Sequence, residues 1–243
     1  YAENILSNKD NTLAIISARE DGLKSRITAK ELREKVLQMA GYLKKNGIKK
    51  GDRVCAYMPN CPETIITMLA TSALGAVFSS CSTDFGVSGV LDRFKQIEPK
   101  ILVTVDGYLY NGKSIDRHNE IHEIVNGLES LENTVVLKYL YVNKNVKYSF
   151  KFDYFDKVYL SEPIEKFRSV NFNDPLYIVF SSGTTGAPKC IVHGVGGVLL
   201  QHAKEHKLHA NIKEGDNVFY FSTCGWMMWN WLVGALFSKA TII

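Results

Sequence analysis

The sequence lacks the cysteine pattern of a disulfide framework or of a structural zinc site. Its five cysteines are odd in number and widely spaced, and no two form a CxxC pair. Small secreted domains carry an even set of paired cysteines, and zinc sites carry closely spaced pairs. We therefore expect reduced thiols in a cytosolic protein; the five residues are Cys55, Cys61, Cys81, Cys190 and Cys224.

Strong charge of one sign and long apolar runs are also absent. The net charge is only +4, and no basic block with interleaved aromatic residues occurs, so we expect no nucleic-acid partner. The most apolar segment, Trp226 to Phe237, is shorter than the ~20 residues of a membrane span, so a buried helix is expected there and no integral membrane segment. The chain begins with Tyr1 and shows no signal peptide.

What is present is the alternation of strands and helices. Composition is that of a globular protein, with 46% hydrophobic and 22% charged residues. A capping box at Thr28 to Glu31 begins one helix, Gly47 ends it, and Pro62 begins the next. The alternation predicts an α/β fold with largely parallel sheets covered by helices. Strands are expected at 12–18, 53–58, 77–80, 101–105, 134–137, 176–180 and 217–221, and further helices at 87–97, 114–128, 195–209 and from about 226.

Two regions depart from this alternation. Residues 142–173 are rich in Lys, Asp, Asn and Tyr with weak periodicity, which predicts an irregular connection holding one short strand. We expect residues 1–173 to form a first α/β lobe with this connection, and residues 174–243 to begin a second lobe. The last residues, Ala240 to Ile243, have the pattern of a strand that is cut short.

The stretch FSSGTTGAPKC, Phe180 to Cys190, is the most informative part of the chain. It follows an apolar strand and precedes a predicted helix, and ligands of parallel sheets gather at that edge. Its glycines allow N–H groups to point inward, its hydroxyls add donors, Pro188 stiffens the loop, and Lys189 adds a mobile positive charge. An ordinary turn is the alternative to a phosphate-binding loop. The candidate phosphate ligands are Ser181, Ser182, Gly183, Thr184, Thr185, Gly186 and Lys189.

A Walker A loop does not fit this stretch. That loop requires GxxxxGK[ST]. Lys189 follows Pro188 instead of glycine, and Cys190 occupies the position of the hydroxyl that binds Mg²⁺. The departure argues against a P-loop kinase or NTPase.

Three histidines form a weaker candidate site. His202, His206 and His209 are spaced to share one face of a helix, and histidines so placed could bind zinc. No carboxylate or cysteine motif accompanies them, and the flanking charged residues indicate a solvated surface. We therefore predict no metal there.

Ser181 to Lys189 resembles the phosphate-loop signature of adenylate-forming enzymes, [ST]SG[ST]TGxPK. That superfamily contains acyl-CoA synthetases, luciferases and the adenylation domains of peptide synthetases. The stretches ITAKELREKV, GDRVCAYMPN, LDRFKQIEPK and GWMMWNW, the last at Gly225 to Trp231, resemble its branch that activates acetoacetate. The likeness is weakest at 106–173, and Thr83 replaces an expected proline.

The resemblance implies a two-step reaction with ATP, Mg²⁺ and coenzyme A. A carboxylate attacks the α-phosphorus and releases pyrophosphate, and the thiol of coenzyme A then displaces AMP to give acetoacetyl-CoA. The resemblance assigns Lys189 a catalytic role in holding the β- and γ-phosphates. A ligase for acetate or propionate, or a non-enzymatic nucleotide- or lipid-binding remnant, are the alternatives.

The resemblance also suggests an acyl pocket near the start of the last helix. Trp226 is the first candidate to border the acyl group, followed by Trp229 and Asn230, although such residues also pack in cores. His193, four residues after Lys189, could border the nucleotide or acyl site, or serve only in packing. Motifs expected further along, including the ribose site and the mobile lid, are absent. We therefore expect a fragment that is inactive alone, from one large incomplete domain.

Overall fold

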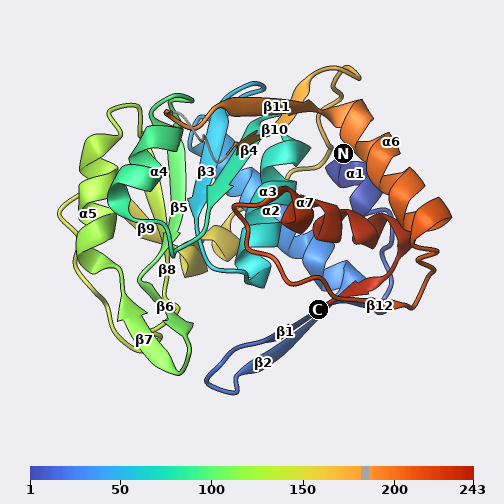
Figure 1. Cartoon of the computed structure of the whole chain (residues 1–243), viewed down its shortest axis with the longest axis horizontal. Coiled ribbons are helices and arrows are strands. Elements are labelled where there is room, and N and C mark those ends of the chain that lie inside the picture. Colours follow the sequence, from blue (N-terminus) through green and yellow to red (C-terminus); the bar gives the residue numbers. More distant parts are fainter. Residues whose placement is uncertain (182–185) are drawn as a thin grey trace.

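The computed structural model describes residues 1–181 and 186–243. A seven-stranded sheet runs through its centre in the order β11-β10-β4-β3-β5-β8-β9 (Figure 1). Neighbouring strands pair in parallel except for the antiparallel pair β10 and β11. The predicted α/β class with largely parallel strands is confirmed. The bounds are β3 (Arg53–Tyr57), β4 (Val77–Cys81), β5 (Ile101–Val105), β8 (Asn133–Leu137), β9 (Phe152–Tyr154), β10 (Pro175–Phe180) and β11 (Cys190–Gly194).

Helices cover both faces of this sheet because successive side chains of a strand point to opposite sides. On β3, Val54 and Ala56 belong to the larger core cluster, whereas Cys55 and Tyr57 belong to a second cluster. Two long helices supply the larger cluster and two others supply the second one. The first pair is α2 (Ala29–Lys45) and α3 (Pro62–Ala73), and the second pair is α4 (Val87–Phe94) and α5 (His118–Gly127).

A second, four-stranded sheet joins the two ends of the chain. Its order is β12-β13-β1-β2, and Ile15 on β1 pairs in parallel with Ile242 on β13. Figure 1 shows the blue β1–β2 hairpin beside the red end of the chain. The remaining helices lie close to this end of the molecule. The elements are β1 (Leu13–Ala18), β2 (Lys24–Thr28), β12 (Asn217–Val218), β13 (Thr241–Ile242), α1 (Ala2–Ile5), α6 (Val195–Lys204) and α7 (Met227–Gly234).

The region after β5 differs from the sequence prediction. A helix was expected over 114–128, but the helix begins at His118, and the preceding residues form a β-hairpin, β6 (Gly107–Tyr110) and β7 (Lys113–Asp116). Asn111 and Gly112 form its turn, with φ of 51° and 71°. Asn-Gly is the preferred pair for such a two-residue turn because both positions need positive φ. Asn111-Gly112 is therefore a sequence signal for this hairpin.

The other differences concern short strands. β2 and β11 were not predicted, and the strand expected over 217–221 is regular only at Asn217–Val218. The irregular connection over 142–173 is confirmed, with β9 as its one strand and a 3-10 helix at Phe155–Leu160. The helix predicted over 195–209 is α6 continued by a π-helix at Glu205–His209.

The start of α2 confirms the predicted capping box. The Thr28 hydroxyl accepts from the Glu31 amide at 3.2 Å, and the Glu31 carboxylate accepts from the Thr28 amide at 2.8 Å. Two N–H groups without helical partners are satisfied in this way. At the other end, Gly47 follows the helix with φ of 85°, a conformation that suits glycine.

We expect the Thr28→Ala substitution to lower the free energy of unfolding by about 1 kcal/mol, because the Glu31 amide loses its cap. Denaturant titration measures this difference. Thr28→Ser keeps the hydroxyl and serves as the matched control, so an equal loss in both variants would contradict the capping explanation.

Residues after 173 contribute to both sheets. β10 extends the central sheet by pairing with β4, while β12 and β13 belong to the second sheet. The division into lobes at residues 173 and 174 remains a proposal.

Among the described residues, no helix combines the length and apolar character that a membrane crossing requires.

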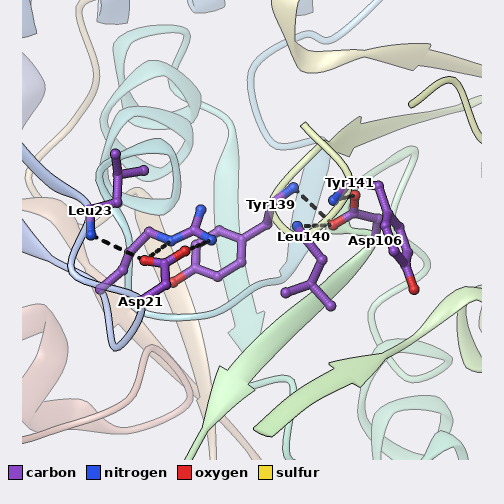
Figure 2. A network of polar contacts seen from close by, with 7 residues as sticks. Asp21, Leu23, Asp106, Tyr139, Leu140 and Tyr141 are labelled. Carbon is purple, nitrogen blue, oxygen red and sulfur yellow. Dashed lines mark hydrogen bonds and ion pairs between the residues drawn. The ribbon is translucent and has the colours of Figure 1, made fainter. Parts of the chain in front are cut away.

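A buried carboxylate anchors the chain after β8. Asp106 is only 3% exposed, and its side chain accepts the amides of Tyr139, Leu140 and Tyr141 at 2.8, 2.8 and 3.0 Å (Figure 2). The Arg19 guanidinium lies over the neighbouring Tyr139 ring, 3.8 Å from the ring centroid. Asp106 therefore fixes a turn against which the β1–β2 hairpin rests.

Candidate phosphate and acyl site at the carboxyl edge of the sheet

The stem of the candidate phosphate loop is a β-hairpin. Phe180 on β10 pairs with Cys190 on β11, and the Ser181 amide donates to the Lys189 carbonyl at 3.0 Å. The Ser181 hydroxyl accepts from the Lys189 amide at 3.2 Å. The helix predicted from about Val195 is confirmed as α6, but the unpredicted strand β11 lies between it and the loop. The candidate ligands Ser182, Gly183, Thr184 and Thr185 lie outside the described residues.

The loop stem lies at the edge of the sheet where ligands of parallel sheets gather. β10 runs parallel to β4, so Ser181 follows β10 at the same edge at which Ser82 follows β4. Gly186 and Lys189 are both exposed there. This arrangement places the Lys189 side chain where an anionic ligand at the carboxyl edge could be reached.

A second loop, residues 222–226, is fixed to the same edge. The Ser80 hydroxyl donates to the Cys224 carbonyl at 2.6 Å, and the Cys224 thiol donates to the Met58 carbonyl at 3.1 Å. Burial raises the pKa of the Cys224 thiol well above its usual value, which keeps the sulfur protonated as a donor. The ends of β3 and β4 thus position the residues that precede α7.

Asn60 is a structural residue of this edge that the sequence prediction missed. Its Oδ1 accepts from the indole Nε1 of Trp229 at 2.9 Å, and its Nδ2 donates to the Ser222 carbonyl at 3.4 Å. It comes two residues after Met58, at the end of β3. The available signal was a polar residue in the loop that follows a buried strand.

The three candidate acyl-pocket residues around α7 have different environments. Trp226 precedes the helix and is 57% exposed, so its ring remains available to a ligand. Trp229 is fully buried and stacks with Phe78 at a centroid distance of 6.3 Å. Asn230 is buried, and its Nδ2 donates to the Trp226 carbonyl at 3.4 Å. Packing therefore accounts for Trp229, while Trp226 has the exposure that a pocket wall requires.

His193 lies further along β11, away from the loop stem. It pairs with Tyr177, and the two rings lie 5.1 Å apart. Partial burial lowers the pKa of His193 below its usual value. The side chain is neutral near pH 7 and has an aromatic packing partner.

The expectation that His202, His206 and His209 lie on a solvated surface is wrong for two of the three. His202 and His206 are 2% and 0% exposed, and only His209 is exposed. The face that bears them packs on α7: His202 Nδ1 leaves no room for a Cβ at Gly234, and the His206 ring lies 4.6 Å from the Trp231 ring. In the described part of the chain, no group of three or more His, Cys, Asp or Glu residues could hold a metal ion.

Burial of His202 predicts a pH-dependent stability. Desolvation, helped by His206 and His193, lowers the pKa of His202 from 6.5 to about 4. The unfolded chain therefore binds a proton as the pH falls through 6.5, whereas the folded chain binds it only near 4. We expect the free energy of unfolding to fall by up to about 3 kcal/mol between these pH values and to level off below them.

Denaturant titrations at a series of pH values test this expectation. The His202→Leu substitution removes the titrating group and should flatten the dependence between pH 6.5 and 4. His209→Leu changes an exposed histidine and should leave the slope unchanged. An unaltered slope in His202→Leu would contradict the assignment.

Comparison with known proteins adds an independent finding. The chain matches the AMP-binding enzyme family over residues 3–243. It is 44% identical over 253 residues to the acetoacetyl-CoA synthetase of Xenopus tropicalis and 46% identical over 246 residues to that of Rhizobium meliloti. Each alignment covers 100% of this chain and 38% or 37% of the relative, so the chain spans less than two fifths of their length.

A solved structure agrees with these relatives. The acetoacetyl-CoA synthetase of Streptomyces lividans superimposes with a TM-score of 0.94 at 37% identity. The match covers 100% of this chain and 37% of that chain. The similarity extends over both sheets, the loop stem at Ser181 and Lys189, and the segment that begins α7.

Proposed function

Because the chain belongs to the family of AMP-binding enzymes, we propose that it is part of an ATP-dependent ligase that joins acetoacetate to coenzyme A. The observation that carries the proposal is the similarity to acetoacetyl-CoA synthetases along the whole chain, at 44% and 46% identity in two of them. The position of Lys189 at the carboxyl edge of the sheet supports it.

The proposed reaction has two steps that balance without a redox partner. A carboxylate oxygen of acetoacetate attacks the α-phosphorus of ATP, and the bond to the β-phosphate oxygen breaks to release pyrophosphate. The product of the first step is acetoacetyl-adenylate. The thiol of coenzyme A attacks its acyl carbon and gives up its proton to solvent, and AMP leaves with the electrons of the broken C–O bond. ATP enters as its Mg²⁺ complex, so the metal ion arrives with the substrate.

The residues of the loop stem have a defined part in the first step. Approach of one anion to another is opposed by charge repulsion, and negative charge builds on the leaving pyrophosphate. Lys189 and the hydroxyl and amide donors of the loop would stabilise that charge on the β- and γ-phosphates. We assign Trp226 to the wall of the acyl pocket, with Asn230 as a further candidate beside it, whereas we assign Trp229 and His193 to packing.

Carboxylate-dependent ATP–pyrophosphate exchange tests the proposal. We would assay the full-length protein and the 243-residue chain, with acetoacetate, acetate and propionate in parallel. Exchange by the full-length protein with strong preference for acetoacetate, and none by the shorter chain, is the expected result. Preference for acetate or propionate would move the substrate to another short acid, and no exchange with any acid would leave a nucleotide-binding protein without ligase activity.

The setting of this activity follows from the same proposal. The partners are acetoacetate, ATP and coenzyme A, all small molecules. We propose a cytosolic location, supported by the widely spaced cysteines, all five of which are free thiols in the described structure. Fractionation of cells that express a tagged full-length protein measures it.

A further inference from the structure

Gln96 connects the loop stem to the helix that covers the sheet. It follows α4, and its Oε1 accepts from the Cys190 thiol at 3.4 Å, while its Nε2 donates to the Pro188 carbonyl at 2.8 Å. Nε2 also donates to the Asp92 carbonyl at 2.6 Å. The two N–H groups of the amide and its oxygen therefore all have partners, and the two chain-crossing bonds are made to the residues on either side of Lys189.

The main chain of Lys189 itself is bonded on the opposite side. Its amide and its carbonyl both pair with Ser181, as the loop stem requires. Gln96 bonds to the two residues that flank Lys189, so Ser181 and Gln96 together hold three consecutive residues, Pro188 to Cys190.

The helix α4, which ends two residues before Gln96, is itself firmly placed. Phe94 is fully buried in the second core cluster, and the Arg93 guanidinium lies 4.5 Å from the Phe85 ring. Gln96 therefore transfers the position of a packed helix to the loop stem, although its own side chain is exposed.

We propose that Gln96 is a positioning residue for ATP, which acts by holding Pro188 and Cys190 so that Lys189 meets the β- and γ-phosphates. This inference rests on the proposed function. Gln96 touches no reacting atom in the proposed ligase reaction. Loss of its bonds leaves Lys189 present and charged but less restricted, so ATP binding weakens while the acyl and coenzyme A sites are unaffected.

Steady-state kinetics of the full-length protein provide the first test. Gln96→Met keeps the length of the side chain and removes its hydrogen bonds to Pro188, Cys190 and Asp92, and we expect it to raise the KM for ATP by about 3- to 10-fold. The KM values for acetoacetate and coenzyme A should change less than about twofold, a split that general destabilisation would not produce. Gln201→Met is the matched control, because Gln201 is another exposed glutamine on a helix, bonded to Glu205 at 3.1 Å.

Variants of Cys190 separate the hydrogen bond to Cys190 from the one to Pro188. Cys190→Ala removes only the bond from the thiol to Gln96 and should give a smaller rise in the KM for ATP than Gln96→Met. Cys190→Ser restores a donor to Gln96 and should return the KM toward the original value. Combining Gln96→Met with Cys190→Ala should add little to Gln96→Met alone, because the two residues share one interaction.

Trypsin cleavage after Lys189, followed by mass spectrometry, gives a readout that needs no catalysis. We expect faster cleavage at this bond in Gln96→Met and unchanged cleavage in Gln201→Met. An unchanged KM for ATP, or a change confined to acetoacetate or coenzyme A, would overturn the inference. If the parent protein shows no exchange activity, the proposed function fails, and unchanged cleavage would then separately refute the role of Gln96.

Discussion

Lys189→Ala lowers carboxylate-dependent ATP–pyrophosphate exchange of the full-length protein by roughly 10- to 1000-fold, by analogy with the loss of one pre-organised donor. The physical reason is the charge that builds on pyrophosphate as it leaves. Ser181 fixes the backbone of Lys189 through two hydrogen bonds, so the side chain starts from a defined position in the loop stem. Because the interaction strengthens as charge develops, kcat should fall more than the KM for ATP rises.

Two further variants make this result specific. Lys30→Ala removes another exposed lysine at the start of α2, far along the chain from the loop, and should leave the exchange rate unchanged. Lys189→Arg keeps the positive charge but not the compact ammonium, and should recover part of the rate. Exchange near the original rate in Lys189→Ala would remove Lys189 from the proposed chemistry.

Asp106→Ala should cause the largest loss of stability, roughly 4 kcal/mol in the free energy of unfolding. Three amides, those of Tyr139, Leu140 and Tyr141, lose their acceptor together (Figure 2). Because the carboxylate is buried, water does not readily replace it, and each unsatisfied N–H group carries its own desolvation cost. Denaturant titration of the original and substituted proteins measures the loss.

The matched control for Asp106 lies in the same region. Asp21 is an exposed carboxylate that accepts the Leu23 amide at 3.2 Å and pairs with Arg19 at 2.7 Å (Figure 2). Asp21→Ala should therefore have only a small effect, since solvent screens the pair and hydrates the freed groups. Equal losses in the two variants would show that burial of Asp106 is not the cause.

The main elements of the fold could be predicted because their signals are local. The capping box at Thr28 and the continuous apolar stretch Ile101 to Val105 each identify an element without reference to the rest of the chain. β11 could not be recognised in the same way. Its residues Ile191 and Val192 are exposed, so it lacks the apolar alternation of a half-buried strand and depends on pairing with β10.

The candidate site likewise has some features with local sequence signals and others that depend on distant contacts. The composition of the loop and the charge of Lys189 identify it from sequence alone. The contacts that hold it in place join residues far apart in the chain, such as Gln96 with Pro188 and Asn60 with Trp229, and no local pattern reports them. The histidines of α6 were misjudged for a related reason: the charges beside them describe one face of the helix, whereas α7 covers the other.

The strand order has a consequence for how the two sheets fold. β1 and its parallel partner β13 are separated in the sequence by every strand of the central sheet. β4 likewise pairs with β10, which is distant in the sequence. The strands β5, β8 and β9, which form the opposite half of the central sheet, lie between β4 and β10 in the sequence. Two strand pairings therefore depend on contacts between segments far apart in the sequence, which favours slow folding and chaperone engagement over early, segment-by-segment completion.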